Sequence, residues 1–153
     1  MKFKILLLIL TATTLSYSSE KFVEIRISDN ISISLYKSEF DTTLHNIERC
    51  IILDWFGICK IDGKQVYGTD WEMPKSKLDS AFVQIDNIKI PLEVSCMYNP
   101  WFGEINKELF SLQKCEGGFI IKGTFSDGAG SYSVEWRIIK NTSLRISIFD
   151  DGC

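Results

Sequence analysis

The sequence predicts an α+β fold: a mostly antiparallel β-sheet of hairpins, arranged as a meander, with one packed helix. Three observations support this prediction. Several segments alternate apolar and polar residues, which is the pattern of strands with one buried face. Asp-Gly and Asp-Asn dipeptides separate these segments where hairpin turns are expected. A single segment, 41–53, instead repeats its apolar residues at helical spacing.

The first two strands are expected to form a hairpin. Residues 22–28 (FVEIRIS) and 31–36 (ISISLY) both alternate apolar with polar side chains. The dipeptide Asp29-Asn30 lies between them and favours a tight turn. Both strands therefore present one apolar face to a common core.

A helix is predicted from about Asp41 to Leu53. The apolar residues of this segment recur at steps of four, three and four, at Phe40, Leu44, Ile47 and Ile51. That spacing places them on one helical face, which we expect to pack on the apolar side of the sheet. Ser38 or Asp41 is the expected N-cap.

Two more hairpins are predicted in the middle of the chain. Residues 58–68 turn at Asp62-Gly63, and residues 82–95 turn at Asp86-Asn87. Pro91 has no amide hydrogen for a ladder, so its strand is expected at a sheet edge. A short strand or helical turn near residues 108–112 is expected in the less regular part that follows.

The last third of the chain predicts three consecutive strands, at about 118–125, 132–139 and 143–149. Pairing Phe125 with Tyr132 places Trp136 opposite Ile121, with the apolar residues of both strands on one face. Continued to the third strand, this register pairs Trp136 with Ile146. Trp136 is therefore expected in the core.

The N-terminal segment has the pattern of a secretory signal peptide. Two lysines precede the apolar run 5–10, and Ser16 and Ser18 supply the small residues at positions −3 and −1 of a cut before Ser19. We expect residues 1–18 to be removed and residues 19–153 to form a single globular β-rich domain, periplasmic or secreted. The apolar run is too short to span a bilayer, so no membrane anchor is expected after cleavage.

The charge of the chain argues against a nucleic-acid partner. Cleavage before Ser19 would remove two lysines and no acid, leaving 15 basic and 20 acidic side chains and a net charge of −5. Phosphate contacts need clustered Lys and Arg, and the sequence has no such cluster.

The cysteines predict at least one disulfide bond. The five candidates are Cys50, Cys59, Cys96, Cys115 and Cys153. In an exported chain they can oxidise, but an odd number leaves at least one without an internal partner, and the pairing stays open. Cys153 is a candidate for fixing the C-terminal end to the body. With one histidine and no C-x-x-C motif, neither a metal nor another cofactor is predicted.

The stretch SDGAGS (126–131) has the composition of a functional loop but lacks the catalytic and phosphate-binding motifs. It has no lysine for a phosphate loop, no second glycine for a nucleophile elbow, and a strand rather than a helix follows it. We interpret it as a hairpin loop with Asp127 at its tip, in which Gly128 and Gly130 can adopt positive φ. It is either a plain turn or a partner-binding loop.

A second candidate site lies in MYNPWFGE (97–104). Tyr98, Trp101 and Phe102 cluster around a proline and a glycine. Aromatic residues on a loop are common anchors of protein interfaces. The alternative is that they close the open end of the sheet core, since large aromatic residues are highly buried on average.

Acidic residues supply the main alternative, a small secreted hydrolase. It would use Asp127 with the C-terminal pair Asp150 and Asp151. His45 is the one obvious general base near neutral pH, but no motif links a nucleophile to it. No catalytic residue is therefore predicted.

Three stretches, DGKQVYG (62–68), MYNPWFG (97–103) and GTFSDGAGSYSVEWRI (123–138), resemble small exported bacterial proteins. Some of these proteins look like immunity proteins, which protect a bacterium from the toxins of its neighbours. The resemblance implies a periplasmic protein that inhibits a toxin enzyme by stoichiometric binding. The predicted partner-binding residues are Asp127, Gly128, Gly130, Tyr98, Trp101 and Phe102. Besides a hydrolase, a structural or adhesin-like β module that accepts a donor strand is the remaining alternative.

Overall fold

The computed structural model describes residues 21–52, 54–101 and 105–151, which form β-strands and short turns. The strands are β1 (Phe22–Ser28), β2 (Ile31–Glu39), β3 (Ile47–Ile52), β4 (Trp55–Ile61), β5 (Lys64–Gln65), β6 (Ser76–Ile85), β7 (Ile88–Leu92), β8 (Phe110–Cys115), β9 (Gly118–Phe125), β10 (Tyr132–Ile139) and β11 (Thr142–Asp150). Helical structure in these ranges is limited to the 3₁₀ turns η1 (Thr42–Leu44), η2 (Lys107–Leu109) and η3 (Gly128–Gly130).

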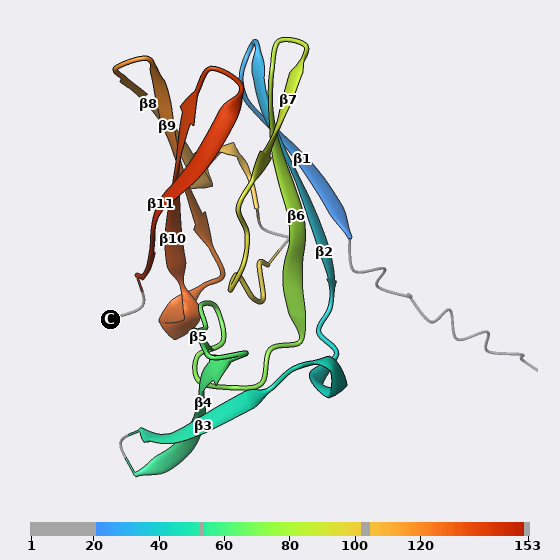
Figure 1. The fold of residues 1–153 in the computed structure, drawn as a ribbon, viewed down its shortest axis with the longest axis vertical. Helices are drawn as coiled ribbons and strands as arrows, with labels where there is room; N and C mark the ends of the chain where they lie inside the picture. Colours follow the sequence, from blue (N-terminus) through green and yellow to red (C-terminus); the bar gives the residue numbers. More distant parts are fainter. Residues whose placement is uncertain (1–20, 53, 102–104, 152–153) are drawn as a thin grey trace, which may run out of the picture.

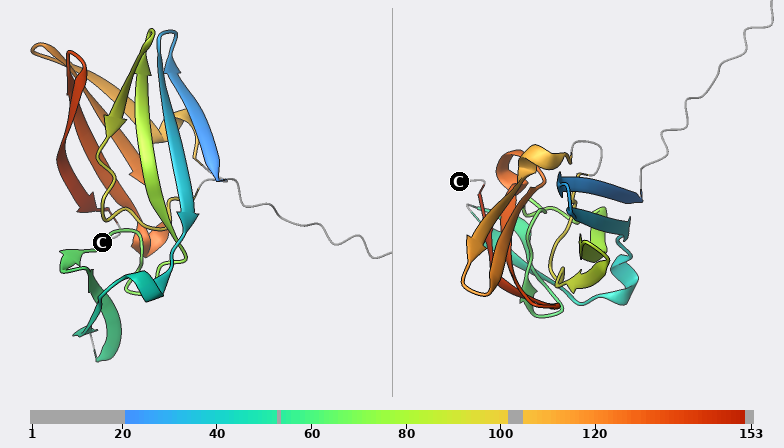
Figure 2. Two further views of the ribbon diagram at one scale, coloured as in Figure 1. Left: turned by 45° about the vertical axis from the view of Figure 1, so that its right-hand side comes forward. Right: turned by 90° about the horizontal axis from the view of Figure 1, so that it is seen from above.

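Two four-stranded antiparallel sheets face each other and enclose the main core (Figures 1 and 2). One has the strand order β1-β2-β6-β7 and the other β11-β10-β9-β8. Alternate residues of the central strands point inward, so that Ile33 and Leu35 of β2 meet Val134 and Trp136 of β10 in one buried cluster. Burial of one face of each sheet is the arrangement of a β-sandwich.

Hydrogen bonds join the two sheets where β7 and β11 pack side by side. The Trp136 indole Nε1 donates to the carbonyl oxygen of Glu93 at 2.8 Å. The Arg145 Nη1 donates to the carbonyl oxygen of Ser95 at 2.6 Å. Both acceptors belong to the segment after β7, so these bonds attach that segment to the opposite sheet and satisfy its backbone.

The predicted hairpins before residue 95 are confirmed as β1–β2, β4–β5 and β6–β7. Asp62 and Gly63 have φ of 53° and 74°, the two positive values of a type I′ turn, and Asp86 has φ of 51°. Pro91 lies in β7, the edge strand of its sheet, as predicted. Near residues 108–112 the chain forms both η2 and the start of β8.

The predicted register of the last three strands is confirmed for β9 and β10 but only in part for β11. Trp136 lies opposite Ile121 and is fully buried. On the other side a bulge after Glu135 places Arg145, not Ile146, opposite Trp136. Ile146 is the extra residue and is partly exposed. The bulge aims the Arg145 side chain across the sandwich, where its guanidinium reaches the segment after β7.

The predicted helix at 41–53 is wrong, and so is the α+β class, because the described chain is β-sheet with no packed helix. Asp41 does cap a turn, since its Oδ1 accepts from Thr43 N at 2.9 Å, but that turn is the three-residue η1. The apolar residues predicted to form the buried helical face are not all buried, since Leu44 is 76% exposed and Ile51 is 68% exposed. The β-branched residues of 47–52 instead pair with β4, where such side chains fit a pleated surface.

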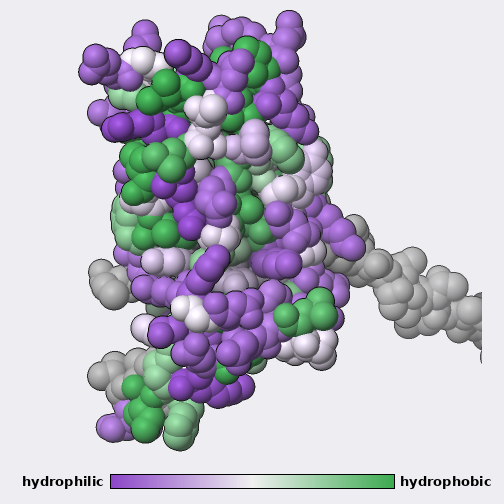
Figure 3. Space-filling view, in the orientation of Figure 1, coloured by the Kyte–Doolittle hydropathy of each residue, from purple (hydrophilic) through white to green (hydrophobic). Residues whose placement is uncertain are grey.

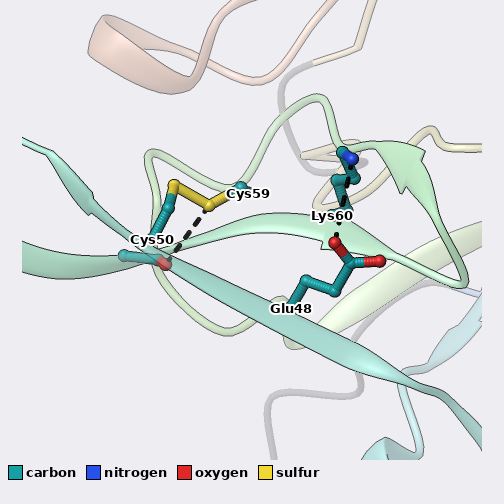
Figure 4. Close-up of a disulfide and its surroundings, with 5 residues drawn as sticks. Glu48, Cys50, Cys59 and Lys60 are labelled. Carbon is teal, nitrogen blue, oxygen red and sulfur yellow. Dashed lines mark hydrogen bonds and ion pairs between the residues drawn. A yellow bond between two sulfur atoms is a disulfide. The ribbon is translucent and has the colours of Figure 1, made fainter.

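β3 and β4 form a hairpin that extends from one end of the sandwich, and β5 completes this third sheet (Figures 1 and 3). A second, smaller core holds its base, built from Phe40, Ile58, Ile61, Val66 and Tyr98. Cys50 and Cys59 form a disulfide across the hairpin, which confirms the predicted disulfide (Figure 4). Two-stranded hairpins are marginal in water, so the disulfide and the second core are what hold this one.

Truncation of Trp136 tests the sandwich core. We expect Trp136→Ala to lower the free energy of unfolding by about 3–5 kcal/mol, because it removes a fully buried large aromatic side chain. Urea unfolding of the oxidised protein measures this loss. Leu144→Ala in β11 is the control, since Leu144 is 65% exposed. A loss under about 1 kcal/mol for Trp136→Ala would contradict the packing described for β9 and β10.

Removal of the disulfide tests what holds the hairpin. We expect the double substitution Cys50→Ser, Cys59→Ser to lower the free energy of hairpin opening by about 2–4 kcal/mol, since the bond no longer restricts the open chain. Hydrogen exchange should then speed up at β3 and β4 amides and stay unchanged in β9 and β10. Cys115→Ser, at a free thiol, is the control. Equal acceleration in both regions would show that the hairpin does not open by itself.

Candidate binding cleft

A hollow of about 520 Å³ lies between the β9–β10 loop, the segment 68–76 and the loop at Trp101. Figure 1 shows η3, in the β9–β10 loop, at the same end of the sandwich as β4 and β5. The charged side chains lining the hollow have both signs: Asp70, Glu72, Asp127, Lys37 and Lys75. A hollow lined in this way suits recognition of a polar or charged group.

The β9–β10 loop is a hairpin tip, as predicted, and it closes through η3. Gly130 N donates to the Asp127 carbonyl oxygen at 3.1 Å, and Ser131 N donates to that of Gly128 at 3.1 Å. Gly128 has φ of 51° and is exposed. The Asp127 side chain makes no capping bond to the turn and is exposed, so it is available to a partner.

Gly130 serves the loop in a different way from the one predicted. The second positive φ belongs to Ser126, at 61°, and Gly130 is not among the residues with positive φ. Gly130 is buried against the backbone of Gly68 and Asp70. This close approach brings the loop onto the segment 68–76 and forms one wall of the hollow.

Asn99 joins the loop at Trp101 to the segment 68–76, and sequence reasoning missed it. Its Oδ1 accepts from Lys75 N at 2.9 Å and from Ser76 N at 3.2 Å. Its Nδ2 donates to the Gly68 carbonyl oxygen at 2.8 Å. One side chain thus fixes both ends of the segment 68–76 to the loop that carries Trp101. The Asn-Pro dipeptide was a signal for a turn here, but a turn signal does not name the tertiary partners.

The aromatic residues predicted to contact a partner, Tyr98, Trp101 and Phe102, have different surroundings in the structure. Trp101 lines the hollow and is 45% exposed, as a binding residue requires. Tyr98 is buried, so its prediction as a partner contact is corrected: it packs edge-on against Phe40, with ring centroids 5.4 Å apart. Burial raises the pKa of Tyr98 to about 12. Phe102 lies outside the described residues.

The acidic residues proposed for hydrolysis do not line one common hollow, although the two hollows concerned share lining residues such as Asp70 and Gly130. Asp127 lines the hollow described above, whereas Asp150 lines another with Trp71 and Gly130. Burial, and then the neighbouring charge of Asp151, raise the pKa of Asp150. The Asp151 carboxylate instead accepts a hydrogen bond from the Ser133 hydroxyl. Asp127 shares its hollow with Asp70 and Glu72, two acids that sequence reasoning did not select.

His45 is part of a structural contact. Its ring stacks on Phe40 with centroids 4.7 Å apart, and its Nδ1 lies 2.6 Å from Asp62 Oδ2. The other carboxylate oxygen of Asp62 accepts from Asn46 N at 2.8 Å. These hydrogen bonds lower the pKa of Asp62, that from His45 being the largest cause. The contact fixes the start of β3 to the β4–β5 turn.

The remaining cysteines form no second disulfide among the described residues. Cys96 and Cys115 are free and partly buried, and Cys153 lies outside the described ranges, as does the predicted cleavage site. Within those ranges no group of three or more His, Cys, Asp or Glu residues could hold a metal ion. The described part of the chain also contains no helix that is long and apolar enough to cross a membrane.

Comparison with protein-family models, with curated proteins and with solved structures found no match to this chain. The resemblance of 62–68, 97–103 and 123–138 to exported immunity proteins therefore stays a prediction. Function has to be inferred from the residues and the geometry of the site.

The Asp62 contact predicts a loss of stability in acid. A carboxylate with a lowered pKa in the folded state stabilises the fold above its usual pKa of 3.8, and this contribution is lost as the pH falls through the folded-state value. Urea unfolding between about pH 5 and pH 2.5 should show this decrease, and it should be smaller in Asp62→Asn. An identical acid dependence in the two proteins would contradict the role given to Asp62.

Proposed function

We propose that this protein is exported and acts by binding another protein, as a stoichiometric inhibitor of the immunity-protein kind. One observation carries the proposal. Asp127 and Trp101, selected separately from the sequence, line the same hollow. An exposed aromatic residue beside an exposed charge is typical of the residues that dominate protein interfaces.

The fixed walls of the hollow support a binding function. Asn99 ties the segment 68–76 to the loop at Trp101, and η3 closes the β9–β10 loop with two backbone hydrogen bonds. A surface that is already ordered loses little conformational entropy when it binds. The partner that fits best presents a basic or polar group to Asp127 and an apolar surface to Trp101.

A hydrolase is the second candidate, favoured by one observation. Asp70 and Glu72 line the hollow together with Asp127, and paired carboxylates are the groups that glycoside hydrolysis uses. A donor-strand module has less support at β7 and β11, because these two edge strands pack against each other, which leaves β1 and β8 as the other edges of the two sheets. The substitutions at Asp127 and Trp101 described next separate binding from catalysis.

The proposal predicts that Asp127→Ala and Trp101→Ala each weaken binding about tenfold or more, since an interface charge or aromatic anchor is lost. The partner is first isolated with the mature protein from periplasm and from competitor secretions, and its affinity is then measured by calorimetry. Glu116→Ala, an exposed acid in the β8–β9 turn, is the control and should bind normally. Thermal unfolding of all three variants should match the wild type.

Two outcomes would contradict this proposal. Unchanged affinity in both cleft variants would place the interface elsewhere. Turnover of a substrate by the purified protein, abolished by Asp127→Ala, would favour the hydrolase.

A further inference from the structure

The apolar face of the β3–β4 hairpin continues beyond the part that the body covers. Ile47 lies opposite Ile61 at the base, and Ile51 lies opposite Phe56 near the end. Ile58 lies between these pairs on the same face, because alternate strand residues share a side. Ile58 and Ile61 are buried in the second core, whereas Ile51 is 68% and Phe56 69% exposed.

The exposed end of this face is a projecting part of the molecule. Figures 1 and 2 show the hairpin extending from the sandwich, and Figure 3 shows hydrophobic side chains at its end as well as separate hydrophobic patches on the body. Two large apolar side chains paired on an exposed strand face mark an interaction surface more often than isolated apolar residues do.

Contacts on the opposite face of the hairpin hold its two strands together. Glu48 and Cys50 lie on that side of β3, where Lys60 Nζ is 3.8 Å from Glu48 Oε2 and the disulfide joins the two strands (Figure 4). The cross-link and the buried base therefore present Ile51 and Phe56 in a defined arrangement. A preformed apolar surface binds with less loss of entropy than a flexible one.

The charge on the apolar face indicates the chemistry of its partner. Arg49 is exposed, lies beside Ile51 on the same face, and has no carboxylate within ion-pair distance in the described ranges. The paired positions of this face, from Ile47 to Ile51 and from Phe56 to Ile61, include no acid. A complementary surface would thus have an apolar groove for the pair and a carboxylate for the guanidinium.

Two other occupants fit this chemistry less well. Face-to-face packing of two copies about an axis near Arg49 would bring the two Arg49 side chains together, and the paired positions of this face hold no acid to separate them. A lipid bilayer would receive the turn first, and Asp54, exposed in that turn, would have to enter the apolar layer as a charge. In a protein groove the turn with Asp54 can remain in water or contact polar groups, whereas insertion into a bilayer would place it among the lipid chains.

We propose that Ile51, Phe56 and Arg49 form a second contact surface, which inserts into an apolar groove of a partner protein that carries a carboxylate at its rim. The inference rests on the proposed function in so far as that function supplies a partner protein. It adds a surface that the sequence did not predict and states the chemistry that the surface recognises.

The test uses random displayed peptides as the probe. Peptides are selected on the oxidised mature protein and counter-selected on the double variant Ile51→Ser, Phe56→Ser. The survivors should contain apolar residues together with Asp or Glu. The affinity of these peptides for the protein should fall about tenfold in Phe56→Ser, which removes an apolar contact, and in Arg49→Gln, which removes the charge that pairs with a carboxylate. Leu144→Ser, which changes an equally exposed residue on β11, should bind as the wild type does.

Each of the following outcomes would overturn the inference. No peptide survives the counter-selection, or the survivors bind Arg49→Gln as tightly as the wild type. The protein binds vesicles of phosphatidylcholine and phosphatidylglycerol through Phe56, which would make the occupant a membrane. The protein dimerises in sedimentation experiments and Phe56→Ser abolishes the dimer, which would make the occupant a second copy.

The cleft variants distinguish this inference from the proposed function. Asp127→Ala should leave the affinity of the selected peptides unchanged. The partner isolated with the mature protein should lose affinity with Phe56→Ser as well as with Asp127→Ala. A loss with Asp127→Ala alone would retain the proposed function and overturn the hairpin surface, and a loss with Phe56→Ser alone would do the reverse.

Discussion

The buried hydroxyl of Tyr132 is the constraint on which the end of the molecule with the hollow at Asp127 and Trp101 depends. Its ring lies fully inside the core, stacked with Phe125 at 5.6 Å between centroids, and its hydroxyl donates to the Tyr98 carbonyl oxygen at 3.2 Å. Burial raises the pKa of Tyr132, so the hydroxyl remains a donor. Gly68 is required beside it, because a Cβ there would lie 2.1 Å from the Tyr98 oxygen. This bond connects the sandwich to the loop that carries Trp101.

The two hydrophobic cores stabilise different parts of the protein. The main core joins two sheets through a large apolar interior, whereas the second core holds only the base of a hairpin and depends on a disulfide to extend further. Tyr98 links them, since it packs on Phe40 in the second core and accepts from Tyr132 of the first through its backbone. The β9–β10 loop and the β3–β4 hairpin consequently lie at the same end of the sandwich (Figure 1).

Local signals in the sequence succeeded where the interactions are local. Asp62-Gly63 and Asp86-Asn87 specify turns by their own conformational preferences, and the alternation of 118–139 allows one register between β9 and β10. They failed at residues 41–53, where Ile47 and Ile51, two of the apolar residues at helical spacing, lie in the strand β3. The choice there depends on β4 as a partner, and spacing within one segment carries no information about a partner. The bulge after Glu135 was missed for a similar reason, since it depends on the reach of Arg145 to Ser95 in the opposite sheet.

The sequence by itself determined the β1–β2, β4–β5, β6–β7 and β9–β10 hairpins, the core position of Trp136, the presence of a disulfide, and the loop and aromatic segment that hold Asp127 and Trp101. Tertiary structure alone decided that these two residues line one hollow, that Tyr98 is buried, and that Cys50 pairs with Cys59. It also decided that Ile51 and Phe56 are left uncovered. The physical reason is the same in each case: turn preference and alternation are properties of neighbouring residues, whereas burial and pairing depend on which distant segments the packed core brings together.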